Sequence, residues 1–570
     1  MNKKDVIKLL EKIAVYMELK GENPFKISAF RKAAQAVETD QRSLSQIDDF
    51  TALKGVGKGT AAVIKEYVET GESETLTSLK KEVPEGLIPL LKLPGLGGKK
   101  IARLYQELGV ESIDNLKAAC EEGKVQALSG FGAKTEEKIL AAVENAGSRP
   151  ERLPIATVLP IAEEIDLLLG GINEIIRYSR AGSLRRTAET VKDLDYIAST
   201  EEPEKVREQI LQVEGLKEVI SSGDTKVSIV LERGVDISID IRLIEDKAFP
   251  STLHHFTGSK DHNVRLRQIA KERGEKISEY GVENNDTGEV RTFETEEEFF
   301  KYFDLEYLSP ELRENGREVE KHKEAASLIS LEDIKGDLHM HTTWSDGAYS
   351  LEEMIEACIK KGYDYMAITD HSFYLKVANG LSAERLRKQM QEIRELNKKY
   401  PEIEVLAGIE MDILPDGSLD YEDDLLAELD IVIASIHSSF SQSQEKIMER
   451  LETALLNPHV DFIAHPTGRI VGERKGYEPD IDQLIKRAAE TNTGLELNAN
   501  PYRFDLNHEH VAKAQEMGVP IFINTDAHDQ AHLEFMDLGV KVGRKGWLKK
   551  ESVMNALTFE ELSKFLKRHE

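Results

Sequence analysis

From residue 335 onward the chain repeats one pattern, and this repeat restricts the fold more than any other feature. A short apolar run ends in a histidine or an acid, and a helix-like stretch follows. The runs end at His339 and His341, His371, Glu410, His437, His465, and Asp526 with His528, and a further run from Gly494 to Asn500 ends in polar residues. Barrel enzymes place their sites at the C-terminal ends of parallel strands. Seven such units therefore predict a β/α barrel with its polar residues gathered at one end.

The chemistry of these strand ends favours a metal centre. His339 and His341 are two residues apart, so their side chains point to the same side of a strand. A single histidine is more often structural, but six of the chain's 15 histidines stand at equivalent strand ends. Mixed imidazole and carboxylate ligands suit Zn²⁺, Mn²⁺ or Fe better than Ca²⁺.

This set resembles the PHP (polymerase and histidinol phosphatase) domain, a distorted (β/α)7 barrel that holds up to three metal ions. The resemblance implies an active, metal-dependent phosphoesterase with Mn²⁺ and/or Zn²⁺, in which the ions activate a water and hold the phosphodiester. All nine matching positions are present: His339, His341, Asp346, His371, Glu410, His437, His465, Asp526 and His528.

A second cluster of acids lies between Ala181 and Thr200. Asp193 and Asp195 would project from the same face of a strand, and the alternating run from Val235 to Ile244 supplies Asp236 and Asp240. Adjacent carboxylates repel each other unless a cation lies between them, and Mg²⁺ takes oxygen ligands. A half-buried strand with solvated acids is the alternative interpretation of this short motif alone.

The residues before these acids can bind phosphate. Gly182 and Ser183 can offer backbone N–H groups, and Arg186 offers a cationic fork. A phosphate cradle next to three carboxylates is typical of two-metal nucleotidyl transfer.

The spacing of these elements resembles the nucleotidyltransferase signature of the family X DNA polymerases. The segment from His255 to Arg267 resembles the one with which that family surrounds the sugar and base of the incoming nucleotide, and the segment from Tyr307 to Asn315 resembles the end of its last subdomain. The resemblance implies Mg²⁺ or Mn²⁺ on Asp193, Asp195 and Asp240, a triphosphate beside Gly182, Ser183 and Arg186, a sugar–base pocket of Phe256, Thr257, Gly258 and Asn263, and Arg267 near the template.

Two positions depart from that pattern. Lys192 stands where relatives commonly have glycine, which affects the expected triphosphate contacts. His254 and His255 precede Phe256, where relatives have an aromatic residue, often tyrosine. Discrimination against ribonucleotides therefore stays open.

Three glycine-containing turns recur in the first 150 residues, at 53–59, 93–99 and 128–134, and each precedes a helical stretch. Glycine allows a tight turn, and the following helix N-terminus presents free N–H groups to a phosphate. The turns resemble helix-hairpin-helix motifs, which bind the DNA backbone without reading sequence. The resemblance implies DNA contacts at Gly55, Gly57, Gly95, Gly97, Gly130 and Gly132, and a monovalent cation on carbonyls near Leu53, Val56, Leu93 and Leu96.

The first hairpin departs from relatives with 5'-deoxyribose phosphate lyase activity, because Val63 stands where they carry a Schiff-base lysine. Lys58 and Lys65 lie nearby, and lyase activity stays open. Lys26, Arg31 and Lys58 are candidates for a 5'-phosphate pocket, and solvated helix faces explain them equally well.

The charge is uneven along the chain. The net charge is −29, yet residues 1–150 carry 23 Lys and Arg against 22 Asp and Glu. DNA contact must then rest on local backbone-amide sites, and we expect it to be sensitive to salt. No apolar run approaches the ~18 residues of a membrane span, and two cysteines indicate neither a disulfide framework nor a zinc site. A reducing cytoplasm is the expected setting.

The order of these segments resembles the bacterial family X DNA polymerases with a C-terminal PHP domain. We expect an all-α helix-hairpin-helix region (1–80 and 81–150), an α+β palm-like nucleotidyltransferase core (151–240), a thumb-like subdomain (241–315), a linker (316–334) and a distorted (β/α)7 PHP barrel (335–570). The predicted function is gap-filling polymerisation of dNTPs on gapped or primed DNA in base excision repair, carried out by a monomer. We also expect 3'-5' exonuclease activity, with 3'-end processing or abasic-site cleavage as possible extensions of it. The alternatives are a phosphatase of small monoesters and a non-catalytic DNA-end scaffold.

Overall fold

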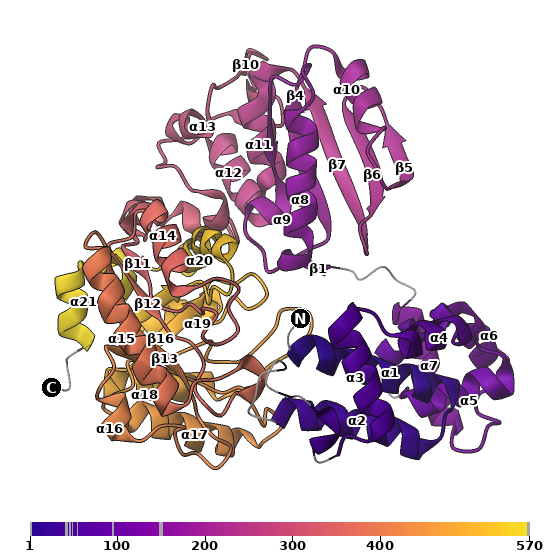
Figure 1. The fold of residues 1–570 in the computed structure, drawn as a ribbon. Helices are drawn as coiled ribbons and strands as arrows, with labels where there is room; N and C mark the ends of the chain where they lie inside the picture. Colours follow the sequence, from indigo (N-terminus) through magenta and orange to yellow (C-terminus); the bar gives the residue numbers. More distant parts are fainter. Residues whose placement is uncertain are drawn as a thin grey trace. The chain divides into compact units, whose positions relative to one another are not determined.

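The computed structural model describes residues 3–39, 44, 47, 49–53, 55–93, 96–146 and 152–566. The chain divides into two compact units, an N-terminal helical unit and a larger unit that begins at Arg152 (Figure 1). No helix among the described residues is both long enough and apolar enough to cross a membrane.

The described residues of the N-terminal unit form helices joined by turns and loops, with no strand among them. The helices are α1 (Lys3–Lys20), α2 (Pro24–Thr39), α3 (Lys58–Thr70), α4 (Glu74–Glu82), α5 (Gly98–Leu108), α6 (Ile113–Glu121) and α7 (Ala133–Ala146). The helices α1, α2 and α3 agree with the all-α region expected from the sequence at residues 1–80. Their apolar faces form one core, in which Leu10 and Ile13 of α1 are fully buried.

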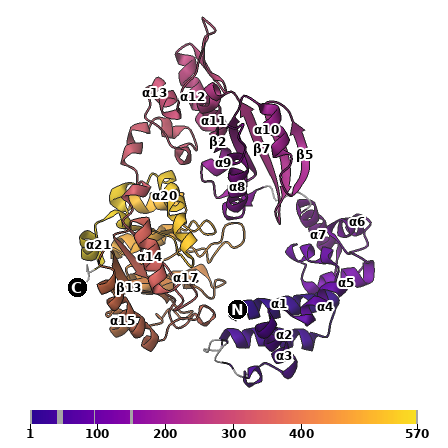
Figure 2. The same cartoon turned by 45° about the horizontal axis from the view of Figure 1, so that its top comes forward.

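The palm is a five-stranded sheet with the order β2-β4-β7-β6-β5. Its strands are β2 (Arg177–Arg180), β4 (Asp193–Ser199), β5 (Leu216–Ser222), β6 (Lys226–Glu232) and β7 (Asp236–Ile244), with α8 (Ile155–Gly170) and α10 (Pro203–Ile210) beside it (Figures 1 and 2). Only β4 and β7 pair in parallel. The hydroxyl of Tyr196 in β4 donates to the carbonyl of Ala162 in α8 at 2.8 Å, which joins this helix to the sheet.

The thumb follows with α11 (Phe249–Thr257), α12 (Lys260–Glu272), a small antiparallel sheet of β8 (Glu275–Ser278), β9 (Gly281–Asn284) and β10 (Val290–Arg291), and α13 (Glu296–Tyr302). The acidic run from Glu294 to Glu306 predicts a solvated helix by its composition, but the structure buries one face of this helix. Phe299 and Phe300 are fully buried and Glu296 is only 6% exposed. Glu294, Glu297 and Glu298 are exposed, whereas Glu296 packs inward with the aromatic pair.

The segment 316–334, expected as a linker, forms short 3₁₀ turns at Arg317–Val319, His322–Ser327 and Leu331–Asp333. Val319, Leu328 and Ile329 are buried. Its few apolar residues are thus used for packing, so the segment has a fixed path along the thumb.

The C-terminal part is a seven-stranded parallel sheet with the strands in chain order. They are β11 (Gly336–Asp337), β12 (Tyr365–Ile368), β13 (Glu404–Asp412), β14 (Ile431–Ser435), β15 (Phe462–Ile463), β16 (Gly494–Asn498) and β17 (Ile521–Asn524). The amide of His341, after β11, donates to the carbonyl of Ala527, after β17, at 2.8 Å. The first and last strands therefore approach each other, and the sheet curls into the predicted seven-unit barrel.

Helices follow the barrel strands: α14 (Leu351–Lys361), α15 (Ala383–Lys399), α17 (Gln444–Leu456), α18 (Ile481–Thr491), α19 (His508–Glu516) and α20 (Phe535–Lys545). The C-terminal helix α21 (Phe559–Leu566) packs on the barrel as expected, because Leu562 is buried beside barrel residues such as Tyr365.

Candidate active sites

The parallel pairing of β4 and β7 brings together the three palm carboxylates predicted as metal ligands. In the register of these strands Asp195 lies directly opposite Asp240, and Asp193 precedes Asp195 on the same face. Burial, reinforced by the charges of Asp193 and Asp240, raises the pKa of Asp195 to about 7. The site thus concentrates negative charge that a divalent cation with oxygen ligands would relieve, so its donor set fits Mg²⁺ or Mn²⁺.

Each of the two acids of β7 has a lysine partner. Lys226 Nζ lies 2.7 Å from Asp240 Oδ2. Asp236 is at the start of the strand and binds Lys217 Nζ at 2.8 Å. The strand register distinguishes the two acids, because Asp240 lies opposite Asp195 of β4 and Asp236 has no partner in that strand.

A short helix, α9 (Gly182–Arg185), begins directly above these acids. The amide of Ala181 donates to the carbonyl of Asp195 at 2.7 Å. Gly182 has φ of 61°, and a Cβ placed there would lie 2.1 Å from Asp195 Oδ2. Glycine is required at this position for two independent reasons, a left-handed backbone and a close carboxylate.

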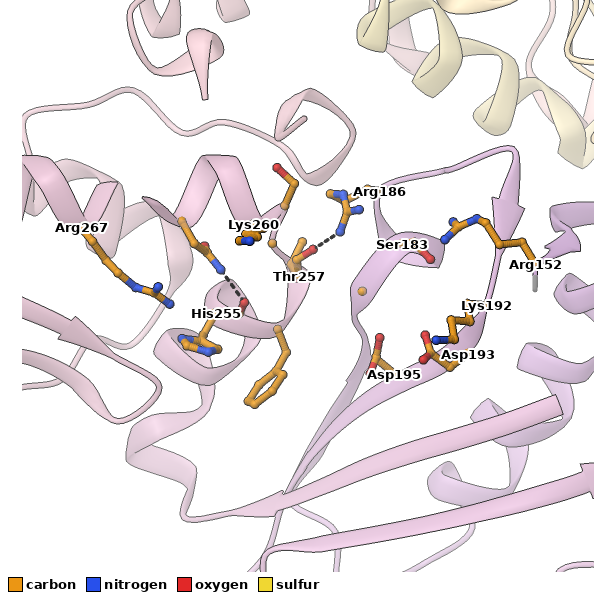
Figure 3. A pocket seen from close by; sticks show the side chains of 15 residues that line it. Arg152, Ser183, Arg186, Lys192, Asp193, Asp195, His255, Thr257, Lys260 and Arg267 are labelled. Atoms are coloured by element: carbon orange, nitrogen blue, oxygen red, sulfur yellow. Dashed lines mark hydrogen bonds between the residues drawn. The ribbon is translucent and has the colours of Figure 1, made fainter. Parts of the chain in front are cut away.

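An open cleft of about 430 Å³ contains the predicted nucleotide-binding residues. Its lining includes Gly182, Ser183, Arg186, Asp193, Asp195, Phe256, Thr257, Gly258, Asn263 and Arg267. Figure 3 shows Asp193 and Asp195 side by side on one wall, with Thr257 and His255 on the other. Arg152 also lines the cleft and was missed by sequence reasoning, whereas His255, Ser259 and Lys260 belong to the segment 255–267 that the sequence singled out, and Lys192 was noted beside the expected triphosphate contacts.

Two arginines of the α9 segment hold the end of α11. Arg185 Nη1 donates to Thr257 Oγ1 at 2.7 Å, and Arg186 Nη1 donates to the Thr257 carbonyl. Burial lowers the pKa of Arg186. The guanidinium of Arg242 lies 4.4 Å from the centre of the Phe256 ring, which fixes this ring at the cleft. The two walls of the cleft are thus connected by cationic side chains.

The barrel brings all nine predicted ligands together at the C-terminal ends of its strands. Their donor atoms form four overlapping groups, each within 4.8 Å: His341, Asp346, His371 and His528; His339, Glu410 and His465; His339, His341 and Asp526; and His371, Glu410 and His437. Glu410 belongs to two groups, with Oε1 2.8 Å from His465 Nε2 and Oε2 3.0 Å from His371 Nδ1. It would therefore contribute ligand atoms to both groups if they hold ions.

Buried nitrogens show that these residues fit metal ions. His339 Nε2, His341 Nε2 and His437 Nε2 are buried and have no hydrogen-bond partner in the described structure. Metal coordination would satisfy each of them.

The protonation of the barrel ligands is strongly coupled. Burial, together with neighbouring histidines, lowers the pKa of His341 to about 3. Burial opposes protonation of His437 as well, yet Glu410 and Asp412 raise the pKa of His437 to about 10. Protons on some imidazoles therefore balance the buried carboxylates, and bound cations would replace them.

A buried glutamate supports the barrel ligands and was not predicted from the sequence. Glu496 in β16 accepts from His339 Nδ1 at 2.7 Å and from the backbone amide of His465 at 2.7 Å. Asn524 Nδ2 donates to the same carboxylate at 3.0 Å. A carboxylate behind a metal-binding imidazole fixes the tautomer and the ring orientation. The polar end of this strand was noted in the sequence, but the partner was not.

The hairpin glycines lie at the starts of helices. Gly57 is the N-cap of α3 and Gly97 the N-cap of α5, while Gly132 precedes α7. Gly55 and Gly130 have φ of 107° and 84°, which favours glycine. Gly95 lies outside the described residues.

Two of the three candidate cations for a 5'-phosphate pocket have acidic partners. Lys26 pairs with Glu22 at 3.1 Å and Arg31 pairs with Glu18, whereas Lys58 is exposed at the start of α3. Val63 is buried in the helical core. The position expected for a Schiff-base lysine is therefore a packing position in this chain.

Comparison with known proteins identifies the chain. Family models match at residues 1–73 (helix-hairpin-helix domain), 87–145 (SAM-like helix-hairpin-helix tandem), 252–314 (DNA polymerase beta thumb) and 337–500 (PHP domain). A Bacillus subtilis (strain 168) protein named DNA polymerase/3'-5' exonuclease PolX is 63% identical over 570 residues, which cover 100% of both chains. The chain belongs to the bacterial family X DNA polymerases with a C-terminal PHP domain.

The barrel of this family X polymerase also has separate relatives. A protein of Thermoanaerobacter sp. (strain X514) named as a probable phosphatase is 30% identical over 230 residues, which cover 38% of this chain and 89% of that protein. A similarly named protein of Acetivibrio thermocellus is 28% identical over 241 residues, or 41% of this chain and 95% of that protein. These relatives match only 38% and 41% of this chain, although most of their own length is covered.

Proposed function

We propose that the chain fills gaps in DNA by template-directed synthesis at the palm cleft and shortens 3' ends at the barrel, as a repair enzyme of the base excision type. The observation that carries the polymerase assignment is the strand register that places Asp195 opposite Asp240, with Asp193 on the same face of the cleft.

In the palm, Asp193, Asp195 and Asp240 would hold two divalent ions, Mg²⁺ or Mn²⁺. When bound, these ions activate the primer 3'-hydroxyl and neutralise the triphosphate. Ser183 and Arg186 orient the triphosphate from the α9 side. Phe256, Thr257, Gly258 and Asn263 enclose the sugar and base, and Arg267 faces the template.

In the barrel, the nine ligands would hold up to three ions of Mn²⁺ and/or Zn²⁺, which when bound supply a water of lowered pKa and clamp the scissile phosphate. Glu496 keeps the His339 ring in place, and the buried walls exclude other water. Activity on abasic sites or blocked 3' ends would use the same residues.

The helical unit would bind the DNA backbone through Gly55, Gly57, Gly95, Gly97, Gly130 and Gly132, with a monovalent cation on carbonyls near Leu53 and Leu93. We propose that residues 1–150 hold gapped DNA and that residues 151–240 and 241–315 act as palm and thumb. Residues 316–334 connect these parts to the barrel, residues 335–570. A cytoplasmic monomer would carry out both reactions.

A labelled primer on a template with a one-nucleotide gap tests both assignments, in Mn²⁺ with and without dNTPs. We expect Asp193→Ala to abolish extension alone and His339→Ala/His341→Ala to abolish shortening alone. Loss of both activities in either variant would contradict two separate sites. Release of phosphate from a small monoester, without nuclease activity, would favour the function suggested by the names of the barrel's relatives instead.

A further inference from the structure

Behind the nucleotide cleft, three buried side chains of the thumb form one hydrogen-bonded row. Glu318 Oε1 lies 2.7 Å from His262 Nδ1, and His262 Nε2 lies 3.1 Å from His254 Nε2. The exposed fractions of Glu318, His262 and His254 are 3%, 0% and 1%. The row joins the turn Arg317–Val319 to α12 and α11, three segments that are separate in the sequence.

The hydrogen bonds determine where the protons lie. A carboxylate oxygen accepts, so His262 Nδ1 donates to Glu318 and the Nε2 of a neutral His262 accepts. His254 Nε2 must then donate, which leaves His254 Nδ1 as an acceptor. That atom is buried and has no hydrogen-bond partner. Burial lowers the pKa of His254 and of His262, in agreement with two neutral rings.

The surroundings isolate this row from water and from other ion pairs. The rings of Phe299 and Phe300 lie with their centres 4.3 and 5.5 Å from that of His254. The nearby buried charges form a separate set, in which Glu296 binds Arg313 at 2.7 Å and Arg185 at 2.6 Å. Breaking the row would therefore leave buried polar atoms without replacement partners, which disfavours any other arrangement of these side chains.

The row is attached to both ends of the segment that lines the cleft. His254 immediately precedes His255 and Phe256, and His262 immediately precedes Asn263. Asn263 Nδ2 donates to the carbonyl of His255 at 2.8 Å, which closes the segment on itself. The path of residues 255–263 thus depends on the distance between His254 and His262.

We propose that Glu318, His262 and His254 are positioning residues that set the shape of the nucleotide-contacting segment 255–263 and thereby the affinity of the cleft for dNTP. The proposal rests on the proposed polymerase function of that cleft. None of the three side chains lines the cleft, so they act through Phe256, Thr257 and Asn263.

Variants of Glu318 in the full chain test this role, with Glu320 as the matched control. Glu320 lies in the same segment and pairs with α12 through Arg265 at 2.7 Å, but this pair is exposed. We expect Glu318→Ala to raise the KM for dNTP about tenfold, as loss of one buried partner implies, with extension at saturating dNTP within about threefold of wild type. Glu318→Gln keeps an oxygen that accepts from His262 and should retain a KM close to that of wild type. Glu320→Ala should leave KM unchanged, and all three variants should shorten primers normally.

Histidine ¹⁵N spectra of the wild-type protein provide a test that needs no variant. We expect His262 protonated at Nδ1 only and His254 at Nε2 only. An unchanged KM in Glu318→Ala, an equal rise in Glu320→Ala, or the opposite tautomers would overturn the proposal. If wild type incorporates no nucleotide, the proposed polymerase function fails instead, whatever the spectra show.

Discussion

The palm cleft and the barrel site both gather carboxylates for metal ions, but they balance the charge differently. In the cleft, Asp195 and Asp240 are partly exposed, Lys226 is a nearby cation, and burial raises the pKa of Asp195 to about 7. In the barrel, Glu410 is fully buried among imidazoles that carry the compensating protons. A cleft that must admit DNA and a nucleotide stays open to solvent, whereas a hydrolytic site can be prebuilt around its ions. The difference predicts distinct responses to mutation, pH and metal.

The largest expected effect is loss of polymerisation when the third palm carboxylate is neutralised. Asp240→Asn should reduce extension about a hundredfold or more, because a metal ligand disappears. Asp236→Asn, on the same face of the same strand, should stay within about twofold because Asp236 only pairs with exposed Lys217. Primer extension and shortening are both measured. Equal losses in the two variants would show that strand register does not select the ligand.

A supporting residue should matter more in the barrel, where the ligands are rigidly enclosed. Glu496→Gln should weaken metal binding about tenfold to a hundredfold, because His339 loses the carboxylate that orients it. Glu404→Gln is the control, because Glu404 is a glutamate at the exposed start of the barrel strand β13. This variant should bind metal with the affinity of its parent. Competition with a chromogenic chelator measures the affinity in the Asp193→Ala background. Normal metal binding by Glu496→Gln would contradict the supporting role.

The two sites should release protons over different pH ranges when metal binds. In the cleft, the pKa of Asp195 is raised to about 7, so metal affinity should be constant above this pH and fall up to about tenfold per pH unit below it. In the barrel, the pKa values of His437 and His528 are about 10 and about 9, so affinity should keep rising with pH to that range. Calorimetry in buffers of different ionisation enthalpy, on Asp193→Ala and on His339→Ala/His341→Ala, counts the protons. Proton release from both variants over the same range would remove the contrast.

The smallest effect is expected at the rim of the cleft. Lys192 lines the cleft and is exposed, so Lys192→Met should raise the KM for dNTP only a few-fold, as befits a solvated cation worth about 0.2–1 kcal/mol. Lys247→Met removes an exposed lysine that does not line this cleft and should leave the KM for dNTP unchanged. Steady-state extension kinetics decide between them, and an unaltered KM in Lys192→Met would exclude a phosphate contact there.

Most of the site could be predicted because regular strands convert short spacings into geometry. Residues two apart on a strand project from the same face, so the spacing placed Asp193 beside Asp195. The C-terminal ends of parallel strands in a β/α barrel meet at one end, so the strand order gathered the nine barrel residues. The helix 294–306 was misjudged because its acids outnumber its aromatic residues, whereas burial depends on which face they occupy. Phe299 and Phe300 share the inner face with Glu296, whose charge two buried or half-buried arginines compensate.

The sequence by itself determined the segment order, the hairpin turns and the candidate metal ligands, because each is encoded within a few residues. Only the tertiary structure decided which groups support them. His339 meets Glu496 from 157 positions away, and Arg185 meets Glu296 from 111 positions away. Such partners carry no local spacing signal, since they become neighbours only when the chain packs and a buried charge must find a counterpart.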